Sequence, residues 1–154
     1  MSANIFIKKN RIPKEETLAI HIAHFLKAKK LIYRFDLAAD IKLTQGQAAK
    51  HKKLQMKERG YPDLFIAEPK NGYAGLYIEL KKDKSEVFLK DGITYKKAAK
   101  KVKNKRGVVI EEYDHIQEQL KMHDKLRAKG YKVVFGFGLK DTIEKIEEYL
   151  SEQF

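Results

Sequence analysis

The chain has 154 residues, and hydrophobic residues make up 43% of them, which is enough for one compact domain with a single core. Lys and Arg number 33 against 21 Asp and Glu, so the net charge is +12 and a polyanionic partner is favoured over a merely lysine-rich surface. The absence of cysteine excludes disulfides, thiolate metal sites and cysteine nucleophiles.

The N-terminal residues 1–11 mix basic and apolar side chains and lack the continuous apolar core of a signal peptide. No stretch of the sequence approaches the roughly 20 apolar residues that a membrane helix needs. We therefore expect a soluble, cytoplasmic protein that has no membrane contact.

The first elements along the chain follow from apolar spacing. Apolar residues three and four positions apart predict a helix over 14–30, with Pro13 suited to its first turn. Alternating aromatic and aliphatic residues predict a strand over 31–37. The polar segment 38–59 has little periodicity, so it is expected to be a loop or a weak helix.

Two apolar strands are expected next, joined as a hairpin. Turn residues at 60–62 precede the apolar run 63–67, which indicates a buried strand. A second turn at Asn71 and Gly72 leads to another apolar run, 76–80. The short connection allows the two strands to pair with each other.

The C-terminal part begins with a strongly basic, sparsely apolar arm over 82–112, predicted to be mobile or ordered by a substrate. Helical spacing then returns over 114–129, and an apolar strand is expected over 131–137. Asp141 and Glu144 have the spacing of a capping box at the start of a last helix.

These elements predict an α/β fold in one domain, 1–154, with a mixed central sheet flanked by helices. The expected order is helix, three strands, helix, strand, helix. His115 and His123 on the later helix show no metal-ligand pattern and are expected to be surface or hydrogen-bonded residues. Gly136 and Gly138 predict a tight turn rather than a phosphate loop.

Candidate chemistry lies at the ends of the two central strands. Side chains alternate along a strand, so Glu79 and Lys81 share a face opposite the apolar residues. Asp63 begins the preceding strand, and pairing would bring its carboxylate near Glu79. Asp63, Glu79 and the Leu80 carbonyl are then candidate oxygen ligands for Mg²⁺. On this interpretation Lys81 orients a water molecule or offsets developing negative charge on a phosphate.

Taken alone, the Glu79 and Lys81 pair is a weak signal, because a solvated ion pair on a strand explains it equally well. Three blocks in order are more specific: residues 60–64 (GYPDL), residues 77–81 (YIELK), and Gln119 followed eleven positions later by Gly130 and Tyr131. Together they resemble the VRR-NUC branch of the PD-(D/E)XK nuclease superfamily, over most of the chain.

This resemblance implies a restriction-endonuclease-like core, metal-dependent cleavage, and similarity to stand-alone phage-type enzymes that act on branched DNA such as Holliday junctions. By position, Glu15 resembles the family's acid on the first helix, with Glu16 as its competitor. An ordinary first-turn acid that interacts with the helix dipole is the alternative for either. Gln119 resembles the family's helix glutamine facing the metal site, whereas the alternative is an exposed polar residue.

The sequence therefore favours a magnesium-dependent DNA endonuclease, with Mn²⁺ as a possible substitute for Mg²⁺ and a homodimer suited to cutting both strands of a symmetric junction. A non-catalytic nucleic-acid-binding module on the same fold is the alternative, and a structural protein whose lysines are incidental is a third. The basic arm is expected either to track DNA phosphates or to be a solvated loop. Its candidate DNA-binding residues are Lys82, Lys84, Lys96, Lys97, Lys100, Lys101, Lys103, Lys105 and Arg106.

Overall fold

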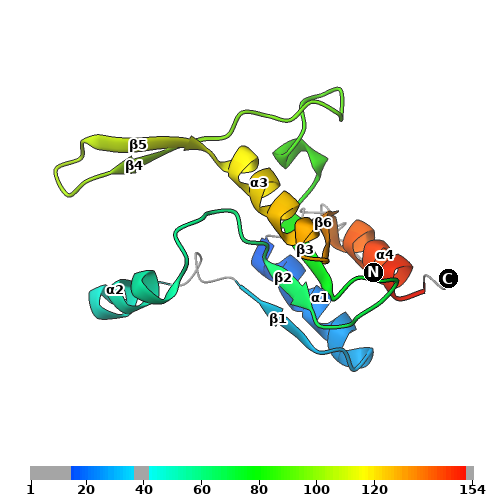
Figure 1. Ribbon diagram of the computed structural model, residues 1–154. Coiled ribbons are helices and arrows are strands. Elements are labelled where there is room, and N and C mark those ends of the chain that lie inside the picture. The colour runs from blue at the N-terminus through cyan, green and yellow to red at the C-terminus, as the bar shows by residue number, and fades with distance from the viewer. Residues whose placement is uncertain (1–14, 37–41, 152–154) are drawn as a thin grey trace, which may run out of the picture.

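The computed structural model describes residues 15–36 and 42–151, and for Glu15 and Glu16 it describes the backbone alone (Figure 1). No helix within these ranges is long and apolar enough to cross a membrane. The predicted ends of the first helix and first strand, Lys14 and Leu37, lie outside the described residues.

The helices are α1 (Glu15–Ala28), α2 (Gln45–Leu54), the short 3-10 helix η2 (Lys84–Glu86), α3 (His115–Ala128) and α4 (Gly138–Ser151). The strands are β1 (Tyr33–Phe35), β2 (Leu64–Ile66), β3 (Leu76–Lys81), β4 (Ala99–Lys103), β5 (Val109–Asp114) and β6 (Lys132–Phe137).

The central sheet is mixed and has the strand order β1-β2-β3-β6. β1, β2 and β3 pair antiparallel, whereas β6 runs parallel to β3. The predicted β2–β3 hairpin is confirmed, with Leu64 opposite Ile78. Its tip is the predicted turn at Asn71 and Gly72, whose φ angles of 53° and 81° suit the left-handed conformation that a two-residue hairpin turn requires. The predicted α/β fold with helices around a mixed sheet is therefore confirmed.

The two faces of the sheet pack against different helices. Leu76, Ile78 and Leu80 of β3 belong to the core that α1 and α4 cover. Tyr77, between them in sequence, belongs instead to a cluster with Met122 and other residues of α3. Because β3 alternates in this way, every odd-numbered side chain from Tyr77 to the end of the strand faces the α3 side.

The segment predicted to be a basic arm, 82–112, has more structure than the sequence indicated. Val87 is completely buried, and the Phe88 ring stacks on Tyr95 with 5.1 Å between the ring centroids. Further along, β4 and β5 form a two-stranded ribbon that extends from the start of α3 away from the central sheet (Figure 1). The lysines of β4 leave little apolar alternation, which is why the sequence did not predict these strands.

In the polar segment 38–59, the weak helix is the correct alternative for the described residues. Helix α2 begins with a reciprocal capping box between Thr44 and Gln47, which satisfies backbone donors at its start. None of its residues is buried. Its formation therefore depends on local capping rather than on packing.

Helix α4 starts earlier than predicted. It begins at Gly138, where φ is 77°, directly after β6, which confirms the expected tight turn. Asp141 lies inside the first turn, so its predicted position at the helix start is wrong. Its carboxylate instead accepts a hydrogen bond from the Phe137 backbone N–H at 2.8 Å and pairs with Lys145, also at 2.8 Å.

Candidate active site

Glu79 and Lys81 lie together on the face of β3 that is turned toward α3. The Lys81 Nζ atom is 3.4 Å from Glu79 Oε1, and only 13% and 5% of the respective side chains are exposed. A pair this buried is not the solvated surface pair that the sequence left open as the alternative. Burying an ion pair is seldom a net gain for folding, so its presence suggests a role in function.

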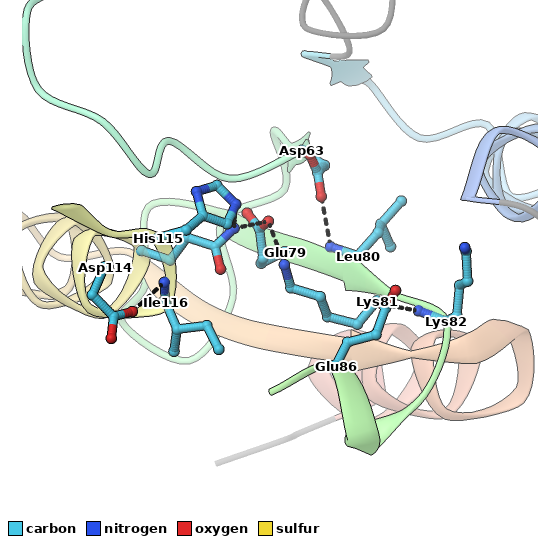
Figure 2. A network of polar contacts seen from close by, with 10 residues as sticks. Asp63, Glu79, Leu80, Lys81, Lys82, Glu86, Asp114, His115 and Ile116 are labelled. Carbon is cyan, nitrogen blue, oxygen red and sulfur yellow. Dashed lines mark hydrogen bonds and ion pairs between the residues drawn. The ribbon is translucent and has the colours of Figure 1, made fainter. Parts of the chain in front are cut away.

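Asp63 reaches the same strand from β2. One residue beyond the observed register of Leu64 with Ile78, Asp63 stands opposite Glu79. Its Oδ2 atom accepts a hydrogen bond from the Leu80 backbone N–H at 2.8 Å (Figure 2). The expected proximity of Asp63 to the Glu79 segment thus follows from strand pairing.

Gln119 joins the cluster from α3. It is 2% exposed, and its Nε2 atom donates to Glu79 Oε1 at 2.5 Å. The alternative of an exposed polar helix residue is therefore wrong. The Gln119 Oε1 atom is also buried and has no hydrogen-bond partner in the described part of the chain, so it can still accept a hydrogen bond from a water or a ligand.

His115, expected from the sequence to be a surface or hydrogen-bonded histidine, is hydrogen-bonded and lies at the site. Its Nε2 atom is 3.2 Å from Gln119 Nε2. An amide nitrogen can only donate, so His115 Nε2 is the acceptor in this contact, which corresponds to the neutral ring with its proton on Nδ1. Burial lowers the pKa of His115, and the nearby cations Lys81 and Lys100 lower it further, which favours the neutral ring. His115, Gln119 and His123 recur at every fourth position of α3, a spacing that places them on one helix face.

His123 lies one turn below Gln119 and is completely buried, with its ring centroid 4.9 Å from that of Phe135. Neither ring nitrogen has a hydrogen-bond partner among the described residues. The expectation of a surface or hydrogen-bonded histidine is therefore wrong for His123. Burial lowers its pKa to about 4, with further contributions from Arg127 and Lys81.

Gly60 explains why the turn before Asp63 can approach α3. Its φ is 84°, and a Cβ atom at this position would lie 2.5 Å from the Glu118 carbonyl oxygen and 2.7 Å from the Gln119 Cα. Glycine alone combines this backbone conformation with so close an approach. Gly60 thus lets the segment that carries Asp63 lie directly on the helix that carries Gln119.

The first-helix acid stays a prediction. Glu15 lies in α1, the helix on which the resemblance places the family's acid, but the side chains of Glu15 and Glu16 are outside the described part. The choice between the two therefore rests on the sequence.

Asp63 and Glu79 offer the hard carboxylate oxygens that magnesium prefers. Among the described side chains, no three His, Cys, Asp or Glu residues come together as a metal site. Magnesium commonly uses only one or two carboxylates and takes its other ligands from water and substrate phosphates. The residues present therefore fit such an ion, with the Leu80 carbonyl as a further candidate ligand.

The residues predicted to bind DNA lie on one continuous segment of the chain, which begins directly after Lys81. Lys96 differs from the others because it is half-buried and its Nζ donates to the Ser85 carbonyl at 2.8 Å, which braces the loop. The exposed members are Lys82, Lys84, Lys97, Lys100, Lys101, Lys103, Lys105 and Arg106.

Comparisons with known proteins bear on the fold. No protein-family model matches the sequence, and no curated protein matches it. Among solved structures, the chain is similar to a "VRR_NUC domain protein" with a TM-score of 0.55 and 20% sequence identity, over 90% of this chain and 88% of that one. The chain therefore has the fold of a VRR-NUC domain, the fold that the three sequence blocks implied.

Proposed function

We propose that the protein is a metal-dependent endonuclease of the VRR-NUC type, within the PD-(D/E)XK superfamily, that hydrolyses DNA phosphodiester bonds. The observation that carries the proposal is the buried contact of Glu79 with both Lys81 and Gln119, beside Asp63. A charged cluster of this kind is costly for folding, and such clusters concentrate at functional sites.

In this proposal Asp63, Glu79 and the Leu80 carbonyl hold Mg²⁺, and Mn²⁺ is able to replace it. When bound, an ion of this kind would polarise the phosphate and lower the pKa of a coordinated water. Gln119 keeps the Glu79 carboxylate in place through its amide hydrogen bond. Lys81, beside Glu79 and partly exposed, is positioned to orient the attacking water or to offset negative charge on the phosphate.

The exposed lysines of residues 82–106 and Arg106 are proposed to contact DNA phosphates. Each phosphate contact releases counterions, so affinity for DNA should fall steeply as salt increases. Binding measured by fluorescence anisotropy between about 50 and 200 mM salt tests this proposal. A flat salt response would show that this segment is only a solvated surface.

Branched DNA is the proposed substrate, and a homodimer is the proposed assembly because two active sites would cut both strands of a symmetric junction. A non-catalytic binding module on the same fold is the second candidate, favoured by the net charge of +12, which would suffice for binding alone. Sedimentation velocity with and without four-way DNA tests the assembly.

Incubation of the protein with labelled linear, flap and four-way DNA, with Mg²⁺, Mn²⁺ or EDTA, distinguishes the two functions. The endonuclease predicts products that require the metal and that appear faster with branched substrates. DNA binding without any metal-dependent product would favour the binding module.

Two substitutions test the assigned roles. Asp63→Asn retains an oxygen that can accept from the Leu80 N–H but loses the charge, so the fold should persist while cleavage falls at least about a hundredfold. Lys81→Ala should lower cleavage similarly and leave DNA binding largely intact. Lys140→Ala is the matched control, because the Lys140 side chain is 91% exposed on α4. Normal cleavage by either site variant would refute the assignment.

A further inference from the structure

The β4–β5 ribbon carries an apolar group at the end that lies farthest from the central sheet (Figure 1). The exposed fractions of Val108, Val109 and Ile110 are 57%, 44% and 64%. Consecutive exposed aliphatic residues at a protruding tip cost solubility, and such patches commonly mark a binding site. We call these three residues the ribbon tip.

The charges around the ribbon tip indicate what it contacts. Lys103 pairs with Val109 across the ribbon, and Lys105 and Arg106 are exposed in the connecting turn. If two copies met at this tip, these cations would face one another and repel. DNA satisfies both features, since its phosphates attract the cations and its bases provide apolar surface.

One face of the ribbon, from Glu111 to Tyr113, is anchored to the segment that leads to Asp63. Arg59 donates from its two terminal nitrogens to both oxygens of Glu111 in β5, at 2.7 and 3.1 Å. Its guanidinium also lies over the Tyr113 ring, 4.1 Å from the centroid. A bidentate ion pair whose guanidinium also stacks on an aromatic ring fixes the orientation of the two segments better than a single surface contact does. Arg59 therefore holds the ribbon at a defined angle to the candidate active site.

We propose that the ribbon tip is a wedge that inserts against base surfaces where the stacking of DNA is open, as it is at a branch point. This inference rests on the proposed DNA-cleaving function and deepens it, because it assigns the preference for branched DNA to named residues. In an intact duplex the base faces are stacked and hidden, so apolar side chains gain little there. Inserting apolar side chains between base steps is a known way in which proteins use opened or kinked DNA.

The experiment compares binding of a flap and of a linear duplex of the same sequence, in EDTA so that neither is cut. Each DNA carries 2-aminopurine, a base whose fluorescence rises when it is unstacked, at the branch or at the equivalent linear position. The test variant is Val108→Ser with Ile110→Ser, and the matched control is Ile93→Ser, since Ile93 is 80% exposed but lies outside the ribbon. All of these side chains are exposed, so the fold should tolerate the changes.

The wild-type protein and Ile93→Ser should bind the flap more tightly than the duplex and raise the fluorescence at the branch. The tip variant should lose about tenfold in flap affinity, about 1.4 kcal/mol, with duplex affinity unchanged and the fluorescence rise lost. Arg59→Lys keeps the charge but loses the two-pronged geometry, so it should lose flap preference while its duplex affinity is retained.

A tip variant that binds the flap like the wild-type protein, or that loses flap and duplex affinity equally, would overturn the wedge while leaving DNA cleavage in place. A shift of oligomeric state in the tip variant, seen by sedimentation, would overturn it in favour of a contact between copies. If the wild-type protein bound and cut no DNA, the proposed function would fail and the wedge with it.

Discussion

The buried His123 ring should make the protein sensitive to acid. Its pKa is lowered from 6.5 to about 4 in the folded state. Because the folded-state pKa lies below the unfolded one, the neutral ring is compatible with folding above pH 6.5. Stability is then lost as the pH falls from about 6.5 toward 4.

The size of the loss follows from the shift. At about 1.4 kcal/mol per pH unit, the difference between 6.5 and about 4 corresponds to about 3 kcal/mol in total, of which about 2 kcal/mol is lost by pH 5. This is a large part of the stability of an ordinary domain, which is about 5–15 kcal/mol.

Urea unfolding followed by circular dichroism at pH 7 and pH 5 measures this loss in the wild-type protein and in His123→Leu. Leucine removes the titrating ring and its unpartnered nitrogens. The decrease in unfolding free energy between pH 7 and pH 5 should therefore be smaller by about 2 kcal/mol in this variant. His21→Leu is the control, because His21 is exposed on α1. An equal loss of stability in the wild-type protein and in His123→Leu would show that protonation of His123 does not cause the loss.

Two further predictions concern the residues around Gln119. Gly60→Ala should lower both the unfolding free energy, by about 2 kcal/mol or more, and the cleavage rate, because the added Cβ would collide with Glu118. Gly92→Ala is the control for the backbone effect alone, since Gly92 also has a positive φ, 70°, but an added Cβ there would have nothing within 4 Å. If urea unfolding showed equal losses of unfolding free energy in the two variants, the collision with Glu118 would not be the cause. His115→Ala should lower kcat about fivefold with KM unchanged, because the acceptor that orients the Gln119 amide is lost. His115→Asn supplies an acceptor and should recover part of the rate in single-turnover cleavage, whereas equal rates for the two variants would argue against a positioning role.

Strand alternation is why the centre of the candidate site could be predicted from the sequence. The period of two placed Glu79 and Lys81 on one face, and the turn at Asn71 and Gly72 allowed β2 to pair with β3. These are short-range features, and local sequence patterns specify them well. The role of Gln119 came from the resemblance, since spacing alone allowed an exposed residue.

The parts that could not be predicted depend on distant contacts or on weak apolar patterns. Arg59 and Glu111 are 52 residues apart, and nothing in the sequence near Arg59 indicates their ion pair. The strands β4 and β5 are largely exposed, so they lack the apolar alternation by which half-buried strands are recognised. His123 looked like an ordinary helix residue because its burial depends on how α3 packs near Phe135.

Asp63, Glu79 and Lys81 are proposed to form a metal-dependent site for cleaving DNA. The most direct test is the single-turnover cleavage rate of a labelled flap, measured over a Mg²⁺ titration with the wild-type protein and with Glu79→Gln. Glutamine keeps an oxygen that can accept from Gln119 Nε2 but removes the carboxylate charge. We predict that the wild-type rate rises with Mg²⁺ and vanishes in EDTA, and that Glu79→Gln binds the flap but cuts it at least about a hundredfold more slowly. Cleavage by the wild-type protein that is independent of metal, or a normal rate in Glu79→Gln, would show that these residues do not form a metal-dependent site.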